Sequence, residues 1–345
     1  MLGLDPSISC KRFSGRRRAP PENDEKRHST RAMASTLPCA PSGLTKRRGV
    51  DSMTPPLQPA HLKRFKMASS PQVDAFRALH EAGCFVMPNP WDVGSARWLR
   101  GQGFKALAST SAGFAFTQGR ADQDVPRDMM LAHLTELVKA VPDLPVNADF
   151  ENGYADTPDG VAANVKLCIA TGVAGLSIED ATGRAEDPLY PFELSVERIR
   201  AARKAIDETG SGVVLTARAE CFLTNHPDAL AESPRRIAAY AEAGADVLYA
   251  PGPKTPEQIA AIVAAAGGKP VNALVYGDFG LTVSDIAGLG VRRISIGGAL
   301  ARAAWAAFIE ATRLISEEGS FAGFAGNGPS SPLNPFFTED LKARS

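Results

Sequence analysis

Short apolar runs alternate with stretches of helical hydrophobic spacing along most of this chain. Eight runs rich in Val, Ile and Leu, each followed by a polar or glycine-containing turn, lie at residues 84–88, 105–110, 145–150, 175–180, 212–220, 246–251, 270–275 and 292–297. Between them, apolar residues recur at the three- and four-residue spacing of an amphipathic helix. This spacing predicts helices over residues 71–82, 93–100, 127–141, 158–171, 195–209, 234–243, 256–266, 283–289 and 300–317.

The ends of several predicted helices carry recognisable signals. A hydroxyl residue that can cap a helix, followed by a proline suited to its first position, occurs at Thr157, Ser233 and Thr255. A glycine, which readily adopts the left-handed conformation that stops a helix, follows at Gly172, Gly244 and Gly290. These signals divide the chain into regular strand–helix units.

Eight alternating units over about 275 residues predict an α/β protein with the (β/α)8 TIM-barrel fold. The alternative is a doubly wound open sheet, which would require a glycine-rich fingerprint after the first strand. Residues 88–91 read Pro-Asn-Pro-Trp and do not provide one. We therefore predict a catalytic barrel over residues 71–325 and a C-terminal tail over residues 326–345. In either fold, ligands bind at the carboxyl ends of the strands.

Composition excludes several classes of protein. Apolar residues make up 44% of the chain and charged residues 22%, which suits an ordinary hydrophobic core. No apolar run reaches the roughly 18 residues needed to cross a bilayer, so we expect no membrane partner. Lys plus Arg and Asp plus Glu each number 38, so the net charge gives no bias toward nucleic acid. The five cysteines are scattered without a Cys-x-x-Cys pair, which favours a reducing, cytoplasmic setting over a disulfide framework.

The zero net charge is the sum of a basic N-terminal segment and an acidic remainder of the chain. Residues 1–70 contain 14 Lys and Arg against 5 Asp and Glu, a net +9, which leaves −9 for residues 71–345. The first 70 residues are also broken by Pro, Ser and Gly and show no hydrophobic period, so we expect a disordered basic extension. They have no apolar segment of the kind a secretory signal needs. Met67, just before the first helical pattern, is a candidate start, and the extension would then be dispensable.

Acidic residues and one arginine fall at the ends of consecutive predicted strands. Asp149 and Glu151 end the third strand, and their two-residue spacing places them on one side of it. Glu179 ends the fourth strand, Asp122 follows the second, and Arg218 ends the fifth. Such a set of oxygen ligands suits Mg²⁺, or Mn²⁺ in its place, and an arginine can grip a carboxylate with two hydrogen bonds. The residues therefore predict a small anionic substrate, although simple pairing that closes the barrel mouth is the structural alternative.

These residues lie within an ordered set of short motifs over residues 72–325 that resembles the isocitrate lyase/phosphoenolpyruvate mutase superfamily. The matching segments are Asn-Pro-Trp-Asp at 89–92, Ser-Thr-Ser-Ala-Gly-Phe at 109–114, Asp122, Asp-Phe-Glu-Asn-Gly-Tyr at 149–154, Ser-Ile-Glu-Asp at 177–180, Ala-Arg-Ala-Glu at 217–220 and Asn272. By this resemblance, the enzyme would form or cleave a C–C or P–C bond next to a 2-oxo acid through an Mg²⁺-bound enolate.

The resemblance also implies a role for each matched residue. Asp149 would be the closest metal ligand, with Asp122, Glu151 and Glu179 orienting the waters around the ion. The substrate would be bound by Ser111, Ala112 and Gly113 through backbone N–H groups, and by Arg218 and Asn272 through side chains. The candidate catalytic residues are Arg218, Glu179 and Tyr190.

One segment departs from the family pattern. Lyases of the family carry Lys-Lys/Arg-Cys-Gly-His in the loop after strand four, whereas residues 181–191 here contain neither Cys nor His. A β-keto acid can lose CO₂ without that proton carrier. Retro-aldol cleavage would need Tyr190, Glu186 or Asp187 to supply the proton. The prediction is thus a Mg²⁺-dependent carbon–carbon lyase acting on a small 2-oxo or 2-hydroxy dicarboxylic acid. Phosphonomutase or phosphonopyruvate hydrolase chemistry and a non-catalytic carboxylate-binding barrel remain as alternatives.

By resemblance we also expect a homodimer or homotetramer, in which neighbouring subunits exchange a C-terminal helix. The amphipathic stretch 300–317 and the apolar segment 332–337 are compatible with that arrangement.

Overall fold

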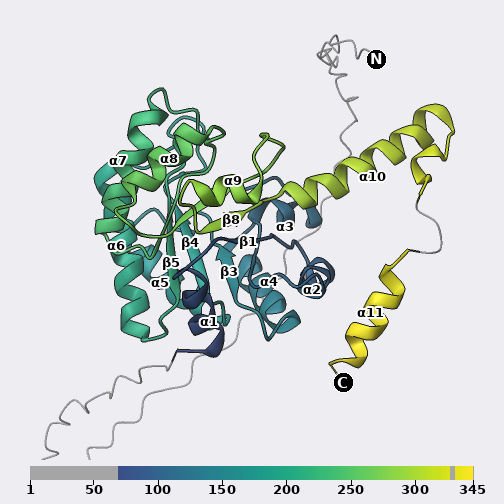
Figure 1. The fold of residues 1–345 in the computed structure, drawn as a ribbon, viewed down its shortest axis with the longest axis horizontal. Coiled ribbons are helices and arrows are strands. Elements are labelled where there is room, and N and C mark those ends of the chain that lie inside the picture. Colours follow the sequence, from purple (N-terminus) through teal and green to yellow (C-terminus); the bar gives the residue numbers. More distant parts are fainter. Residues whose placement is uncertain (1–68, 327–330, 345) are drawn as a thin grey trace, which may run out of the picture. The chain divides into compact units, whose positions relative to one another are not determined.

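Eight parallel strands form one sheet at the centre of the protein. The computed structural model describes residues 69–326 and 331–344, so nearly all of the extension predicted over residues 1–70 lies outside the described residues. The strands are β1 (Phe85–Met87), β2 (Leu107–Ala108), β3 (Val146–Asp149), β4 (Gly175–Glu179), β5 (Val214–Arg218), β6 (Val247–Tyr249), β7 (Val271–Leu274) and β8 (Arg293–Ser295). Figure 1 shows them surrounded by helices.

The sheet closes on itself as a barrel. Its strand order is β1-β8-β7-β6-β5-β4-β3-β2, so β1 pairs with β8 while β1 and β2 form the two edges. The backbone N–H of Ala108 donates to the carbonyl of Pro88, and Asn89 Nδ2 donates to the carbonyl of Ser109 at 2.9 Å. These bonds join the two edges just beyond β1. The predicted (β/α)8 barrel is confirmed.

Each strand lies within one of the eight predicted apolar runs, and helices follow the strands. They are α1 (Pro71–Leu79), α2 (Val93–Gly101), α3 (Ser111–Thr117), α4 (Arg127–Ala140), α5 (Pro158–Ala170), α6 (Phe192–Thr209), α7 (Ala229–Glu242), α8 (Pro256–Ala265), α9 (Val283–Gly288), α10 (Ala299–Glu318), the 3₁₀ helix η1 (Ala322–Phe324) and α11 (Leu333–Lys342). The pattern did not predict α3 as a helix, nor the helix α11 within the C-terminal tail.

Two of the three predicted helix starts are confirmed. Thr157 and Thr255 cap α5 and α8 by accepting hydrogen bonds from backbone N–H groups three residues on. Ser233 was wrong as a helix start, because α7 begins at Ala229 and has Pro234 in its interior. Glu232 accounts for the added turn, since its carboxylate pairs with two arginines of the following turn.

The core fills the barrel and the space between the sheet and its helices. Helix α1 lies against the amino end of the barrel, where Phe76 is fully buried. A Cβ added at Gly175 would lie 2.5 Å from Cε1 of Phe76, so this strand position requires glycine. With its amino end closed in this way, the barrel leaves its carboxyl end for a ligand.

The last helices differ from the others in what they contact. Of α10, which the structure describes throughout, only Ala301 is buried. Helix α11 packs on α2: the rings of Phe336 and Trp98 lie 4.8 Å apart, and Asp340 pairs with Arg97 at 3.0 Å. Among the described residues, no helix is long and apolar enough to cross a membrane.

Candidate active site

A cavity of about 440 Å³ opens at the carboxyl ends of the strands. Its wall contains six residues that the sequence singled out, namely Ser111, Ala112, Asp122, Asp149, Arg218 and Asn272. Glu151 and Glu179 instead line a neighbouring cavity of about 370 Å³. The structure thus gathers the predicted metal and substrate residues around two adjoining spaces.

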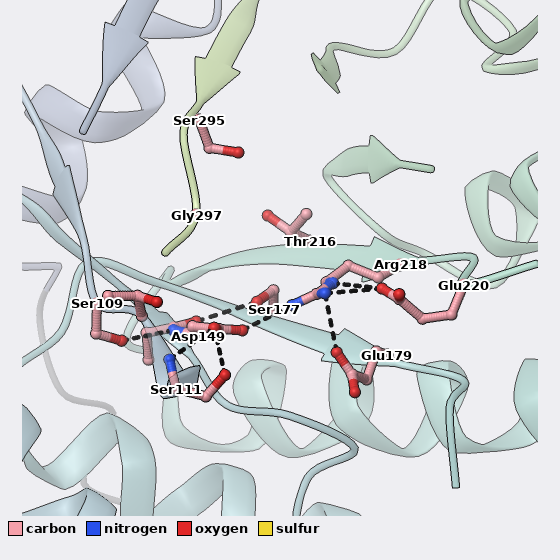
Figure 2. Close-up of polar contacts among 12 residues, drawn as sticks. Ser109, Ser111, Asp149, Ser177, Glu179, Thr216, Arg218, Glu220, Ser295 and Gly297 are labelled. Atoms are coloured by element: carbon pink, nitrogen blue, oxygen red, sulfur yellow. Dashed lines mark hydrogen bonds and ion pairs between the residues drawn. The ribbon is translucent and has the colours of Figure 1, made fainter. Parts of the chain in front are cut away.

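Asp149 is held by four groups at the end of β3. Its Oδ2 accepts hydrogen bonds from the backbone N–H and the hydroxyl of Ser111, both at 2.9 Å. Its Oδ1 accepts from Arg218 Nη1 at 2.7 Å, and its own N–H donates to Ser109 Oγ at 2.8 Å. Figure 2 shows these bonds converging on the carboxylate from two sides. The carboxylate is therefore fixed in orientation before any ligand arrives.

Arg218 bridges three carboxylates. Besides Asp149, its guanidinium pairs with Glu179 at 3.0 Å and with Glu220 at 2.8 Å (Figure 2). Burial alone would lower the pKa of Arg218, but the three carboxylates together raise it well above its usual value. Arg218 is thus a permanent cation, and its contacts in this structure are with protein carboxylates.

Carboxyl groups outnumber guanidinium groups around Arg218. Burial, followed by the carboxylates of Asp149 and Asp122, raises the pKa of Glu151 to about 8. Surrounding protein atoms and Asp149 likewise raise the pKa of Asp122, although this residue lies at the exposed edge of the cavity. Burial raises the pKa of Glu220 to about 7 even though Arg218 opposes the shift. Five carboxyl groups around one guanidinium favour the entry of another cation.

The donor set fits a hydrated divalent ion. Glu151 Oε1 is buried without a normal hydrogen bond to any described residue. The nearby Tyr154 hydroxyl lowers the pKa of Glu151 and so opposes the shift caused by burial. Its oxygen is also buried and makes no normal hydrogen bond to a described residue. No three acidic, His or Cys side chains in the described part of the chain converge to cage an ion by themselves. The carboxyl groups of this cluster are nevertheless oxygen donors of the kind that Mg²⁺ binds while it keeps several of its waters.

The Ser111–Gly113 segment forms the first turn of α3, and only part of it is available to a ligand. The N–H of Ser111 donates to Asp149, and the N–H of Gly113 donates to the capping hydroxyl of Thr110 at 3.2 Å. The N–H of Ala112, at the second helical position, has no partner within the helix. Of the three donors expected from the resemblance, the Ala112 N–H is the one not bonded to Asp149 or Thr110, and Ala112 lines the cavity together with Ser111.

Tyr190 is not brought to the cavity. Its hydroxyl donates to Asp156, and the Arg198 guanidinium lies 3.9 Å from its ring centroid. The side chain is buried between the loop after β3, which contains Asn152 and Asp156, and Arg198 of α6, and it lines neither of the two spaces described above. The structure therefore gives Tyr190 a role in anchoring the loop.

Several residues of the cavity wall were not predicted. Asn147, Ser177 and Ser295 are small polar residues facing into the barrel, and Arg293 and Arg302 add two cations. A periodic signal could have identified two of them, because Asn147 and Ser177 lie two positions before Asp149 and Glu179 on the same strands. Asn89 belongs to one of the matched motifs but was not predicted as a site residue. Its Oδ1 accepts hydrogen bonds from the N–H groups of Ile296 and Gly297, which fixes the loop after β8.

Comparison with known proteins identifies the family. A family model described as phosphoenolpyruvate phosphomutase matches residues 76–316. The chain belongs to the phosphoenolpyruvate mutase/isocitrate lyase superfamily. The chain is therefore an enzyme of the lyase type with the fold of this superfamily, and members of the superfamily generally depend on a divalent metal ion.

Three relatives illustrate the similarity. A crystal structure from Burkholderia cenocepacia, provisionally described as a lyase/mutase, is 46% identical, with a TM-score of 0.73 over 77% of this chain and 96% of that one. The structure of 2,3-dimethylmalate lyase is 26% identical, with a TM-score of 0.69 over 81% of this chain and 98% of that one. An oxaloacetate decarboxylase of Bradyrhizobium is 32% identical over 49% of this chain and 59% of its own length.

Proposed function

We propose that this protein is a Mg²⁺-dependent carbon–carbon lyase that acts on a small 2-oxo or 2-hydroxy dicarboxylic acid. The observation that carries the proposal is the gathering of five carboxyl groups around Arg218 beside a cavity. Mn²⁺ would serve in place of Mg²⁺, because both prefer oxygen ligands. The names of two relatives, 2,3-dimethylmalate lyase and oxaloacetate decarboxylase, support the same class of substrate.

The chain's own residues would bind and orient the reacting acid. When bound, Mg²⁺ supplies positive charge that stabilises the negative charge developing on the substrate oxygens. Asp149 would hold the ion, with Asp122, Glu151 and Glu179 orienting its waters. The Ala112 N–H and the Asn272 amide would donate to substrate oxygens. Arg218 would keep Asp149 and Glu179 in place and add its own charge to the site.

The loop after β4 favours decarboxylation over retro-aldol cleavage. It contains no Cys or His, and its three candidate proton donors lie away from the main cavity. Tyr190 is bonded to Asp156, and Asp187 pairs with Arg184. Loss of CO₂ from a β-keto acid needs no general base at the enzyme, so the missing groups do not hinder it.

A pyruvate-coupled assay tests the proposal. Oxaloacetate and a set of 2-alkylmalates would be supplied to the full chain, with Mg²⁺ or with EDTA. We expect Mg²⁺-dependent release of pyruvate from at least one acid, with oxaloacetate foremost. Phosphate release from phosphonopyruvate, with no pyruvate from any dicarboxylate, would instead indicate a P–C bond enzyme. Stabilisation by these acids with no product would indicate a carboxylate-binding barrel.

We also propose that the chain assembles as a homodimer or homotetramer through α10. Apolar side chains of this helix are largely exposed, including Leu300, Trp305, Phe308, Ile309 and Ile315. Contiguous exposed apolar surface of this kind marks an interaction site.

The three described cysteines are free thiols, which supports a reducing, cytoplasmic setting.

A further inference from the structure

Arg293 is a buried cation without an acidic partner. It begins β8, is only 2% exposed and reaches into the barrel interior. Its Nε donates to Asn272 Oδ1 at 2.8 Å, and its Nη2 donates to Thr216 Oγ1 at 3.1 Å. Both acceptors are neutral, and no carboxylate in the described part of the chain forms an ion pair with it.

The third neighbour of Arg293 is neutral as well. His80 Nδ1 lies 2.7 Å from the carbonyl oxygen of Phe76. A carbonyl can only accept, so Nδ1 carries the hydrogen and Nε2, 3.5 Å from Arg293 Nη1, offers a lone pair. Burial and the charge of Arg293 lower the pKa of His80 to about 3, which keeps the ring neutral. Burial lowers the pKa of Arg293 to about 9, so the guanidinium is still charged at neutral pH.

Arg293 also fixes how Asn272 faces the cavity. An arginine can only donate, so the oxygen of the Asn272 amide must point at Arg293 and the nitrogen must point away. Asn272 Nδ2 donates one hydrogen to Ser295 Oγ at 2.9 Å. Its second hydrogen has no acceptor among the described residues. Asn272 therefore offers a ligand a donor, and an anion is the natural acceptor.

These groups lie across the barrel from the acidic cluster. Arg293, Asn272 and Ser295 all line the same cavity as Asp149 and Arg218. In this eight-stranded order, β7 and β8 stand opposite β3 and β4. Figure 2 accordingly shows Ser295 on a separate strand, apart from the Asp149–Arg218 cluster. The cavity thus has an acidic side that suits a metal ion and a side with uncompensated positive charge.

We propose that Arg293 makes the β7–β8 side of the cavity a receptor for the second carboxylate of a dicarboxylic acid. Arg293 acts as a positioning residue, through its charge and through the amide of Asn272. An unpaired buried charge is costly, and a ligand carboxylate would be the counter-ion that the protein itself does not provide. The inference rests on the proposed function, because that function places the other end of the acid at Asp149.

A matched pair of unreactive probes tests the inference. Malonate carries two carboxylates, whereas malonamate has the same size with one carboxylate replaced by a carboxamide. Titration calorimetry at pH 7.5 on the full chain should show malonate binding at least about tenfold more tightly, as expected for one charge-assisted hydrogen bond. Arg293→Met should remove this preference. Equal binding of the two probes to the wild type would overturn the inference.

The Asn272→Asp variant is a second test, in case Arg293→Met loses the preference only because it fails to fold. The new carboxylate would give Arg293 its missing counter-ion, so the variant should melt no lower than the wild type and yet lose its preference for malonate. Arg302→Gln removes an exposed cation from the rim of the same cavity and should keep the preference. A preference that survives in Asn272→Asp and Arg293→Met, or that is lost only in Arg302→Gln, would overturn the inference.

Pyruvate release in the same preparations separates this inference from the proposed function. A wild type that binds malonate through Arg293 but cleaves no acid would contradict the proposed function alone. A wild type that releases pyruvate while its Arg293 variants keep the malonate preference would contradict this inference alone.

Discussion

Tyr190 and His133 are both buried rings with polar atoms, and their partners determine what each can do. Tyr190 gives its hydroxyl hydrogen to Asp156 and stacks under Arg198, so its polar atom is satisfied by the loop that it anchors. His133 stacks on Phe114 with ring centroids 3.8 Å apart, but its Nε2 is buried without a partner among the residues described. The first residue is thus a candidate anchor and the second a source of acid sensitivity.

Tyr190→Phe distinguishes an anchoring role from a catalytic one. The ring and its contact with Arg198 remain, while the hydroxyl's hydrogen bond to the exposed carboxylate of Asp156 and the weaker one from Asn152 Nδ2 are lost. We expect the free energy of unfolding to fall by about 1 kcal/mol and pyruvate release to fall less than about threefold. Urea denaturation and the coupled assay measure the two effects. Loss of turnover with the fold intact would make this hydroxyl the proton donor.

His133→Phe should reduce the sensitivity of the protein to acid. Burial lowers the pKa of His133 from 6.5 to about 4, so below pH 6.5 the unfolded chain takes up this proton while the folded chain does not. Stability is therefore lost as pH falls from about 6.5 towards 4. The variant keeps the stacked ring and should be more stable than the wild type by about 2 kcal/mol at pH 4.5.

Denaturation at pH 7 and pH 4.5 measures this difference. His80, whose pKa is lowered to about 3, stays in the variant, so the loss with acid should shrink and not vanish. An unchanged loss between the two pH values would contradict the account of His133.

At the scale of elements, two similar hydroxyl–proline motifs, Thr-Pro at 157–158 and Ser-Pro at 233–234, have different roles. Thr157 caps α5 by accepting from the N–H of Gly160, whereas Ser233 lies inside α7 with its hydroxyl oxygen buried and lacking a normal hydrogen bond in the described structure. Thr157→Ala should cost about 1 kcal/mol of stability. Ser233→Ala should change stability by less than about 0.5 kcal/mol. Urea denaturation of both variants is the measurement, and equal losses would contradict the difference between the two sites.

The strands and most helices could be predicted from the sequence, because each has a hydrophobic pattern of its own within a short stretch of chain. Asp149, Glu179 and Arg218 could also be placed, since the ends of parallel strands must meet at one face of a barrel. The side chains that these three residues contact could not be predicted. That Arg218 would bridge three carboxylates depends on the register of β4 against β5, which pairs Glu179 with Arg218. The start of α7 was missed because Glu232 stabilises the extra turn through side chains of the next turn.

The neutral surroundings of Arg293 were equally hidden from sequence reasoning. They come from the residue that ends α1, from β5 and from β7, and the most distant of them, His80, lies 213 residues before Arg293 along the chain. A local sequence pattern cannot predict which charged side chains lack an oppositely charged partner, because their neighbours come from elements that meet only when the barrel closes. The uncompensated cation is therefore a property that only the structure shows.

At the scale of the whole molecule, the exposed apolar side chains of α10 are the basis of the proposed assembly. Phe308 is 57% exposed on this helix, and Ile309 beside it is 58% exposed. If α10 forms the proposed contact between subunits, Phe308→Glu should convert the oligomer to a monomer by placing a charge in an apolar interface. Light scattering coupled to size exclusion measures the mass, with Glu317→Gln on the same helix as the control. A wild type that is monomeric throughout would contradict the proposed assembly.

The central claim is that Asp149 holds a divalent ion on which cleavage of a dicarboxylic acid depends. The most direct test is pyruvate release from oxaloacetate as Mg²⁺ is titrated into wild type, Asp149→Asn and the surface control Asp143→Asn. We predict that EDTA abolishes the activity of the wild type, that Mg²⁺ restores it, and that Asp149→Asn lowers it by about 10²–10³-fold while Asp143→Asn does not. Full turnover in EDTA, or in Asp149→Asn, would contradict the account.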